Sequence, residues 1–327
     1  MTTALAEALE AHRRIRDYVI KTPTVHSKGL SSLCGVEVFL KLEHRQTTGS
    51  FKLRGATNAI AQLTEQELRR GVATASTGNH GRAIAHAAKA AGSSAKICMS
   101  RLVPENKVSE IRRLGADVRI VGNSYDEAES ELDRLVTEEG RVMVHPSDDA
   151  AIIAGQGTVG LEIVEAVPNV ATVLVPLGSG GLSAGIASAV KGMRPSARII
   201  GLTMERGAAM KASLDAGHPV QVKEYESLAD ALCGGIGLSN KLTFTMCREL
   251  LDDVILLSES EISGGIRYAY EQEHEVVEGA GATGVAALLA RKVPDIQGPL
   301  VVVLSGRNVD PELHRRVIEG ERAPFGE

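Results

Sequence analysis

The chain contains little of what marks disulfide-bonded, membrane-spanning or nucleic-acid-binding proteins. Its four cysteines (Cys34, Cys98, Cys233 and Cys247) are widely spaced and form no Cys-x-x-Cys pair, which argues against a disulfide framework or a zinc site. No apolar run reaches about eighteen residues, so the sequence predicts no transmembrane helix. The net charge is −5, without a basic stripe or tail, which leaves nucleic acid no surface to bind.

Targeting signals and aromatic residues are scarce as well. Residues 1–19 have the pattern of an amphipathic helix, not the charged-then-apolar order of a signal peptide. We therefore expect a cytoplasmic protein with reduced thiols. Aromatic residues make up 3% of the chain, with no tryptophan, while hydrophobic residues reach 43%, which is ordinary for a globular protein. The 327 residues exceed what one compact core usually holds, so we expect two domains.

Short β-branched runs alternate with helical patterns in two series. The predicted strands lie at 71–76, 94–100, 117–122 and 141–146, and then at 171–178, 197–204, 253–258 and 299–306. This alternation indicates an α/β fold with parallel sheets that are covered by helices on both faces. We expect two doubly wound domains, with a smaller one (56–147) inserted in a larger one (1–55 and 148–327). Ligands of such sheets bind at the carboxyl ends of strands.

The stretch TGSFKLRGATNA, residues 48–59, contains a lysine in unusual surroundings. Lys52 stands between Phe51 and Leu53, and Phe51 is one of only four phenylalanines. Most lysines are solvated surface residues. An amine held among apolar side chains loses hydration, so its pKa falls and it becomes a nucleophile or a base. The sequence therefore makes Lys52 a candidate Schiff-base lysine.

A glycine-rich turn follows the predicted strand at 171–178. Gly178, Gly180 and Gly181 flank Ser179, and such a turn lets backbone N–H groups and a helix N-terminus approach a phosphate. A tight strand–helix connection would need fewer glycines. The same glycines, with Glu205 downstream, could also belong to a dinucleotide-binding site of a dehydrogenase. That alternative has imperfect spacing and leaves the lysine motif unexplained.

Two further polar loops follow strands. STGNHG groups Ser76, Thr77, Asn79 and His80 at a helix start, which suits a carboxylate better than a simple helix cap does. SGRN, residues 305–308, ends the last strand with a serine that could hydrogen-bond a heterocyclic nitrogen. By contrast, two other histidines lack such neighbours, and we interpret them as structural: His86 and His145.

Together with EGAGATG (278–284), these stretches resemble the fold-type II pyridoxal-phosphate enzymes, in the threonine dehydratase and serine racemase branch. The resemblance runs in order along nearly the whole chain. It implies the tryptophan synthase β-like fold, pyridoxal 5′-phosphate as cofactor and a homodimer. The implied reaction removes the β-hydroxyl of a hydroxy amino acid, to give a 2-oxo acid and ammonia.

The resemblance also implies residue roles. Lys52 forms the Schiff base with the cofactor and acts as the base at Cα. Thr77 stands where racemases carry a serine that reprotonates Cα, so weak racemisation is expected beside elimination. The implied cofactor-binding residues are Phe51, Lys52, Asn79, Gly178, Ser179, Gly180, Gly181, Leu182, Glu278 and Ser305. The substrate carboxylate falls to Ser76, Thr77, Asn79 and His80.

The chain departs from the family pattern in places that bear on its substrate. Arg45 and Arg307 replace an apolar residue and a glycine, and two added arginines near the site would suit an anionic or unusual substrate. Ala128 stands where some relatives have an arginine for a side-chain carboxylate. SLADALCGGIG (227–237) and SGRNVD are most similar to dehydratases associated with hydroxyectoine breakdown. L-threonine or L-serine is the alternative substrate, and a catalytically idle binding protein remains another class.

Metal-activated relatives bind Mg²⁺ after the strand at 197–204, through an acid, a main-chain oxygen and an Asp. Neither register of this chain supplies that set, because one ends in Lys211 and the other contains no acid: Glu205, Ala209 and Lys211, or Thr203, Gly207 and Ala209. We therefore expect no metal site.

Overall fold

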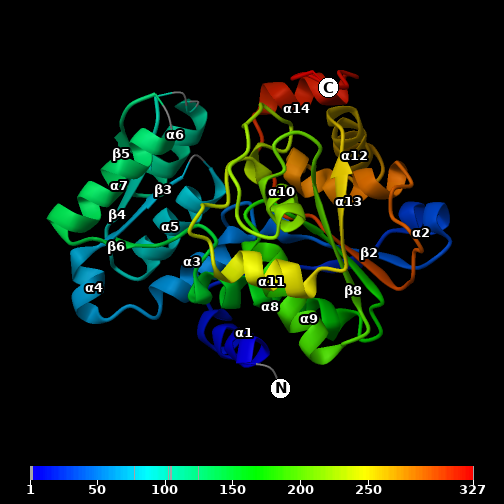
Figure 1. Cartoon of the computed structure of the whole chain (residues 1–327), viewed down its shortest axis with the longest axis horizontal. Helices are drawn as coiled ribbons and strands as arrows, with labels where there is room; N and C mark the ends of the chain where they lie inside the picture. Colours follow the sequence, from blue (N-terminus) through cyan, green and yellow to red (C-terminus); the bar gives the residue numbers. More distant parts are fainter. Residues whose placement is uncertain (1–2, 77, 102, 104, 124, 327) are drawn as a thin grey trace.

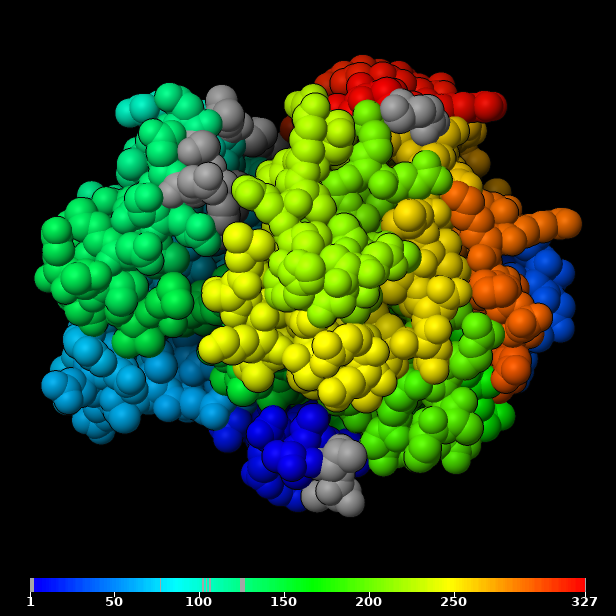
Figure 2. Space-filling view, in the orientation of Figure 1, coloured from blue at the N-terminus to red at the C-terminus, as the bar shows by residue number. Residues whose placement is uncertain are grey.

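A computed structural model describes residues 3–76, 78–101, 103, 105–123 and 125–326 of the chain. Figure 1 shows two α/β units side by side, each built on its own sheet. Figure 2, in the same orientation, shows the smaller unit as a separate lobe at the left of the larger one. The chain enters the larger unit, passes through the smaller one and returns to the larger.

The larger sheet has six strands in the order β1-β2-β10-β7-β8-β9. Their bounds are β1 Thr24–His26, β2 Val38–Lys41, β7 Thr172–Pro176, β8 Arg198–Met204, β9 Asp253–Leu257 and β10 Leu300–Val303. All neighbours pair in parallel except β1, which runs antiparallel to β2. The predicted strands of the second series were therefore correct, whereas β1 and β2 were not predicted.

The smaller sheet has four strands in the order β5-β4-β3-β6, all parallel. Their bounds are β3 Val72–Ala75, β4 Ala95–Met99, β5 Asp117–Ile120 and β6 Val142–Met143. Each lies inside one of the predicted strands. The helices of this unit are α4 Glu65–Arg70, α5 Asn79–Ala90, α6 Glu105–Arg113 and α7 Tyr125–Glu139.

Helices cover both faces of the larger sheet. They are α1 Thr3–Ile15, α2 Lys28–Cys34, α8 Ala150–Ala166, α9 Gly181–Met193, α10 Ala209–Ala216, α11 Leu242–Leu250, α12 Glu259–Glu271, α13 Gly279–Leu289 and α14 Pro311–Ile318, with short 3-10 turns η1 Glu43–Arg45 and η2 Asp230–Leu232. Side chains of a strand alternate between faces, and β7 shows the result. Val173 and Val175 pack with α8 and α9, while Leu174 packs with α12 and α13.

Helix α3 (Lys52–Ile60) lies between the two units. Leu53, Ala56 and Ile60 belong to the core of the smaller unit, while α3 also packs on α8 of the larger one. The domain limits that we predicted, between 55 and 56 and between 147 and 148, stay a prediction, and the first of them falls within α3.

Two sequence-based expectations concern the whole chain. No helix among the described residues is long and apolar enough to cross a membrane. Cysteine pairing is also absent: Cys34, Cys98, Cys233 and Cys247 are all free thiols. Burial raises the pKa of the Cys247 thiol to about 12, so it is not a reactive thiolate.

Candidate active site

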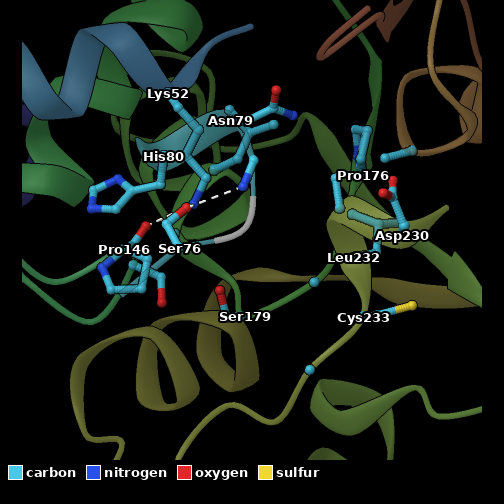
Figure 3. A pocket seen from close by; sticks show the side chains of 18 of the residues that line it. Lys52, Ser76, Asn79, His80, Pro146, Pro176, Ser179, Asp230, Leu232 and Cys233 are labelled. Carbon is cyan, nitrogen blue, oxygen red and sulfur yellow. Dashed lines mark hydrogen bonds between the residues drawn. The ribbon is translucent and has the colours of Figure 1, made fainter. Parts of the chain in front are cut away.

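A cavity of about 370 Å³ lies where the carboxyl ends of strands from both sheets meet. Figure 3 shows Lys52, Ser76, Asn79, His80 and Pro146 on one side of it, and the residues after β7 and around η2 on the other. Every predicted site residue that the structure describes lines this cavity: Phe51, Lys52, Ser76, Asn79, His80, Gly178, Ser179, Gly180, Gly181, Leu182, Glu278 and Ser305. Thr77 lies outside the described residues.

Lys52 opens helix α3 and reaches into the cavity. Its Nζ donates a hydrogen bond of 2.7 Å to the carbonyl oxygen of Pro146 and lies 5.5 Å from the centroid of the Phe51 ring. In the part of the chain that the structure describes, Lys52 forms no salt bridge to a carboxylate. Burial therefore lowers the pKa of Lys52 to about 8, so about a tenth of the amine is unprotonated at pH 7, far more than for an ordinary lysine.

The glycine turn after β7 leads into helix α9, whose first turn has no capping side chain. Gly180, the N-cap residue of α9, has φ of 92° and provides no side-chain cap. A Cβ on Gly178 would lie 3.0 Å from the backbone of Leu232, and one on Gly181 would lie 3.2 Å from that of Ser147. Glycine is thus required for close packing, and the first N–H groups of α9 have no partner within the helix. Such groups bind a phosphate well.

Two side chains of the STGNHG loop already have hydrogen-bond partners within the protein, which the sequence did not indicate. Ser76 Oγ accepts a hydrogen bond of 2.9 Å from the Gly81 amide, which is a helix-capping contact. His80 donates from Nε2 to the carbonyl oxygen of Val144 at 3.1 Å, and its buried Nδ1 has no partner. Burial, followed by the charge of Lys52, lowers the pKa of His80 to about 3. The neutral ring therefore has no N–H left for a carboxylate, and only the His80 backbone amide could donate.

Asn79 and Glu278 form a polar pair at the opposite strand ends. Asn79 Nδ2 donates to Glu278 Oε1 at 2.7 Å, and the Asn308 amide donates to Glu278 Oε2 at 2.9 Å. Asn308 Nδ2 also donates to Asn79 Oδ1 at 2.5 Å. Burial, together with the nearby carboxylate of Asp230, raises the pKa of Glu278 to about 7. Glu278 is thus a carboxyl group that changes charge near neutral pH.

Some cavity residues escaped the sequence interpretation. His145, interpreted as structural, lines the cavity, and its Nδ1 accepts the amides of Ser147 and Asp148 at 3.1 and 2.8 Å. The neutral ring must then carry its proton on Nε2. Its position at the carboxyl end of the strand predicted at 141–146 could have indicated this. Asn308 lies within the SGRN motif, but its link to Asn79 joins residues too far apart for sequence spacing to reveal.

Neither Arg45 nor Arg307 lines the cavity, so the expectation that they add positive charge near the site stays a prediction. Arg45 Nε donates to Glu275 Oε2 at 3.1 Å, and Arg45 Nη2 bonds the other oxygen, so its charge is compensated. Arg307 is exposed, and both arginines lie outside the cavity. The charged pair that does line it is Lys107 and Asp230, whose Nζ and Oδ2 are 2.6 Å apart.

These groups fit pyridoxal 5′-phosphate. The first N–H groups of α9 and the glycine turn, where a Cβ would crowd the backbone, suit a phosphate. The amine of Lys52, which forms no salt bridge among the described residues, suits an aldehyde. Ser305, only 2% exposed, lines the cavity as a neutral hydroxyl at the end of β10. The rival dinucleotide interpretation needs Glu205 in the cavity, but Glu205 pairs with Lys292 at 3.2 Å and lies outside it.

Comparisons with known proteins lead to the same cofactor. A Sinorhizobium fredii protein provisionally named threonine dehydratase is 64% identical over 315 residues, covering 96% of this chain and 95% of that protein. An L-threonine ammonia-lyase of Thermotoga maritima is 42% identical over 315 residues, covering 96% of this chain and 78% of the relative. Maize serine racemase has the same fold, with a TM-score of 0.91 at 33% identity over 96% of both chains.

The match to a family extends over most of the chain. Residues 15–306 match the family of pyridoxal-phosphate-dependent enzymes, a range that contains the motifs of the cavity except the last two residues of SGRN. Because this family uses pyridoxal phosphate, the nicotinamide-dependent dehydrogenase alternative is set aside. The chain belongs to the pyridoxal-phosphate-dependent enzymes, within the threonine dehydratase and ammonia-lyase family.

Proposed function

We propose that this enzyme removes the β-hydroxyl group of a hydroxy amino acid, with a 2-oxo acid and ammonia as products. The observation that carries the proposal is the amine of Lys52, which faces the cavity with no carboxylate partner among the described residues and a pKa lowered to about 8. When bound, pyridoxal phosphate supplies an electron sink for the carbanion at Cα. The side chains and backbone amides of this chain bind the cofactor and the substrate and transfer the protons.

Each group has a stated task in this proposal. The amides from Gly178 to Leu182 bind the phosphate, and the Ser305 hydroxyl faces the ring nitrogen without forcing it to keep a proton. The free amine of Lys52 takes the Cα proton as general base. Ser76 and the backbone amide of His80 bind the substrate carboxylate. The β-hydroxyl leaves with a proton as water, and hydrolysis then releases ammonia.

The attachment of the cofactor is the first test. Holoenzyme should absorb in the violet, and borohydride should fix the cofactor irreversibly to one peptide. We expect mass spectrometry to find the reduced adduct on Lys52. A cofactor fixed to another lysine, or no fixed cofactor at all, would contradict the proposal.

The substrate is the finer part of the proposal. Because the arginines lie outside the cavity, we place L-threonine and L-serine first. A hydroxyectoine-derived amino acid is the second candidate, and one observation favours it. The loop at 231–237 lines the cavity, and a Cβ on Gly234 or Gly237 would meet no atom within 4 Å, so this side of the cavity is open.

A comparison of kcat/KM decides between these candidates. The panel is L-threonine, L-serine, threo-3-hydroxyaspartate and the hydroxyectoine-derived amino acid. A tenfold preference corresponds to about 1.4 kcal/mol of transition-state discrimination. A tenfold preference for threonine would end the hydroxyectoine hypothesis, and the reverse preference would establish it. D-serine formed from L-serine as fast as pyruvate would show that the expected ranking of elimination above racemisation is wrong.

Assembly and location remain predictions from the sequence. We propose a homodimer in the cytoplasm, by resemblance to the family. Light scattering of purified protein at several concentrations tests the first part, since a mass of one chain, 34.5 kDa, at all of them would contradict it.

A further inference from the structure

The first turn of α3, which carries Lys52, has no capping side chain. Its N-cap residue is Phe51, whose side chain offers no hydrogen-bonding group. The Phe51 amide donates to the carbonyl oxygen of Ser305 at 3.1 Å, and the Arg54 amide donates to that of Phe51 at 3.0 Å. Backbone hydrogen bonds thus connect this turn to the end of β10. The side chain of Arg54 makes a second connection to the larger unit.

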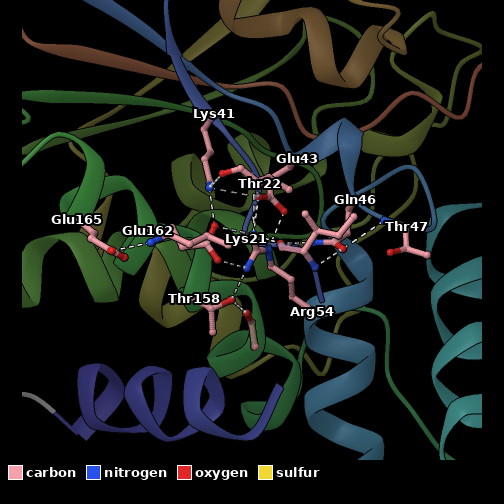
Figure 4. Close-up of polar contacts among 12 residues, drawn as sticks. Lys21, Thr22, Lys41, Glu43, Gln46, Thr47, Arg54, Thr158, Glu162 and Glu165 are labelled. Atoms are coloured by element: carbon pink, nitrogen blue, oxygen red, sulfur yellow. Dashed lines mark hydrogen bonds and ion pairs between the residues drawn. The ribbon is translucent and has the colours of Figure 1, made fainter. Parts of the chain in front are cut away.

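Arg54 is fully buried and its guanidinium grips two carboxylates (Figure 4). Nε and Nη2 donate to the two oxygens of Glu43, each at 2.8 Å. Nη1 and Nη2 donate to the two oxygens of Glu162, at 2.7 and 2.8 Å. A further bond of 3.2 Å reaches Thr158 Oγ1. Two bidentate pairs on one planar guanidinium define its position and its orientation.

Lys41 completes a neutral cluster of four charges. Its Nζ lies 2.5 Å from Glu162 Oε2 and donates to the carbonyl oxygen of Thr22 at 2.7 Å. The side chains of Lys41, Glu43, Arg54 and Glu162 are at most 3% exposed. Apolar residues of equal volume often give the same stability as such a cluster. What apolar packing does not reproduce is the fixed direction of the hydrogen bonds.

Three helices connect this cluster to the glycine turn. A Cβ on Gly155 of α8 would lie 2.6 Å from Gly55 Cα of α3, and one on Gly185 of α9 would lie 2.7 Å from the Gly157 amide of α8. The helices α3, α8 and α9 are thus stacked backbone to backbone. Helix α3 begins at Lys52 and α9 begins at Gly181, so this stack sets the distance between the amine and the phosphate-binding turn.

We propose that Arg54 is a positioning residue for Lys52, an inference that rests on the proposed function. Its grip on Glu43 and Glu162 holds the start of α3 to the larger unit, although Leu53 and Ile60 of the same helix pack in the smaller unit's core. The amine of Lys52 then keeps its place relative to the glycine turn when the two units shift. Without these hydrogen bonds, Lys52 is still present but its amine is displaced from the glycine turn.

The test separates positioning from stability by keeping the cluster neutral. Arg54→Met/Glu43→Gln removes one charge of each sign and leaves the Lys41–Glu162 pair intact. Lys41→Met/Glu162→Gln is the comparison variant, since it removes the same number of buried charges but weakens only the Arg54–Glu162 contact and leaves the bond pair between Arg54 and Glu43. We expect both doubles to fold and to have similar melting temperatures.

The kinetic outcomes differ. We expect kcat per bound cofactor to fall about 10²-fold in Arg54→Met/Glu43→Gln, because misplacement by about 1 Å has that cost, with KM changed less than about threefold. Lys41→Met/Glu162→Gln keeps the Arg54–Glu43 bond pair and should lose kcat by about tenfold at most. The visible absorbance of the holoenzyme should also titrate at a different pH in the first double only. Equal kcat and equal titration in the two doubles would overturn the proposal and leave the cluster a structural role.

Arg54→Lys keeps the test decisive if the double variant does not fold. It preserves the positive charge but loses the bidentate hydrogen bonds to the two carboxylates, so we expect the same fall in kcat. Wild-type kcat in Arg54→Lys would overturn the proposal. Failure of the proposed function is a separate result, because it appears as a borohydride adduct that is absent from Lys52 in the wild-type enzyme.

Discussion

Two lysines of this enzyme, the buried Lys41 and the half-buried Lys52, lie in opposite surroundings. Lys41, the last residue of β2, is fully buried and pairs with the carboxylate of Glu162 at 2.5 Å. Lys52 faces the cavity, and its hydrogen bond goes to a neutral carbonyl, that of Pro146. Burial lowers the pKa of both, but Glu43 and Glu162 oppose this for Lys41, while nothing comparable opposes it for Lys52. A charged partner thus makes one lysine structural, and its absence makes the other reactive.

The buried carboxyl groups follow the same rule. Burial would raise the pKa of Glu43, but Arg54 and Lys41 lower it below its ordinary value. Among the described residues, the hydrogen-bond partners of Glu278 are the amides of Asn79 and Asn308, and burial with the charge of Asp230 raises its pKa to about 7. The cluster therefore keeps its charges fixed, and the cavity holds groups that gain or lose a proton near neutral pH.

The largest effect should follow from removing the reactive lysine. Lys52→Ala deletes both the attachment point of the cofactor and the general base, so we expect elimination to fall by at least about 10³-fold and the violet absorbance to disappear. Steady-state release of 2-oxo acid and an absorbance spectrum measure both. Lys21→Ala, at an exposed lysine, is the control and should behave as wild type. A borohydride-reducible adduct in Lys52→Ala would contradict the assignment.

Stability should respond in the opposite way to the loss of a charge in the two regions. Arg54→Met leaves two carboxylates with one cation in a dry cluster, and we expect the free energy of unfolding to fall by about 3–5 kcal/mol. Lys52→Met removes an unpaired amine, so its unfolding free energy should stay equal or rise. Urea unfolding of cofactor-free protein measures both. If Arg54→Met costs less than Lys52→Met, the contrast between the regions fails.

Glu278 should make stability depend on pH. Its pKa is raised from 4.5 to about 7 in the folded state, so its contribution is fully present below pH 4.5 and is lost as pH rises through 7. Glu278→Gln lacks this titration and should therefore become more stable relative to wild type by about 3 kcal/mol between pH 4.5 and pH 8. Unfolding curves across that range measure the difference. A constant difference would mean that Glu278 stays ionised throughout.

Much of the site could be predicted because its residues lie in short motifs at strand ends. The STGNHG, GSGGL and SGRN loops follow strands whose β-branched runs identify them, and parallel strands bring their carboxyl ends together. Partners that sequence spacing does not encode could not be predicted. His80 loses its ring N–H to Val144, Arg45 is compensated by Glu275, and Arg54 meets Glu162 through packing between helices.

The short strands β1 and β2 of the larger sheet could not be predicted for a similar reason. β2 is short and its neighbour β1 is only three residues long, so neither gives a clear period. β1 pairs with β2, and β2 pairs on its other side with β10, more than 250 residues later in the chain. The buried cluster could not be foreseen either, since Lys41, Arg54 and Glu162 look like ordinary surface charges in the sequence. Tertiary packing, and not local pattern, places them in the core.

The smallest effects should come from an exposed ion pair, which extends the comparison to a third environment. Lys211 Nζ lies 2.6 Å from Asp215 one turn further along α10, in the segment where metal-activated relatives bind Mg²⁺. Solvent screens such a pair, so Lys211→Met should lower the unfolding free energy by only about 0.3–0.5 kcal/mol. The ammonium also supplies a positive charge where a cation would bind, and EDTA or added Mg²⁺ should therefore change neither kcat nor the melting temperature. Activity that EDTA abolishes and Mg²⁺ restores would show that a metal binds there despite the lysine. A loss of several kcal/mol in Lys211→Met would place this pair with the buried cluster instead of with the solvated surface.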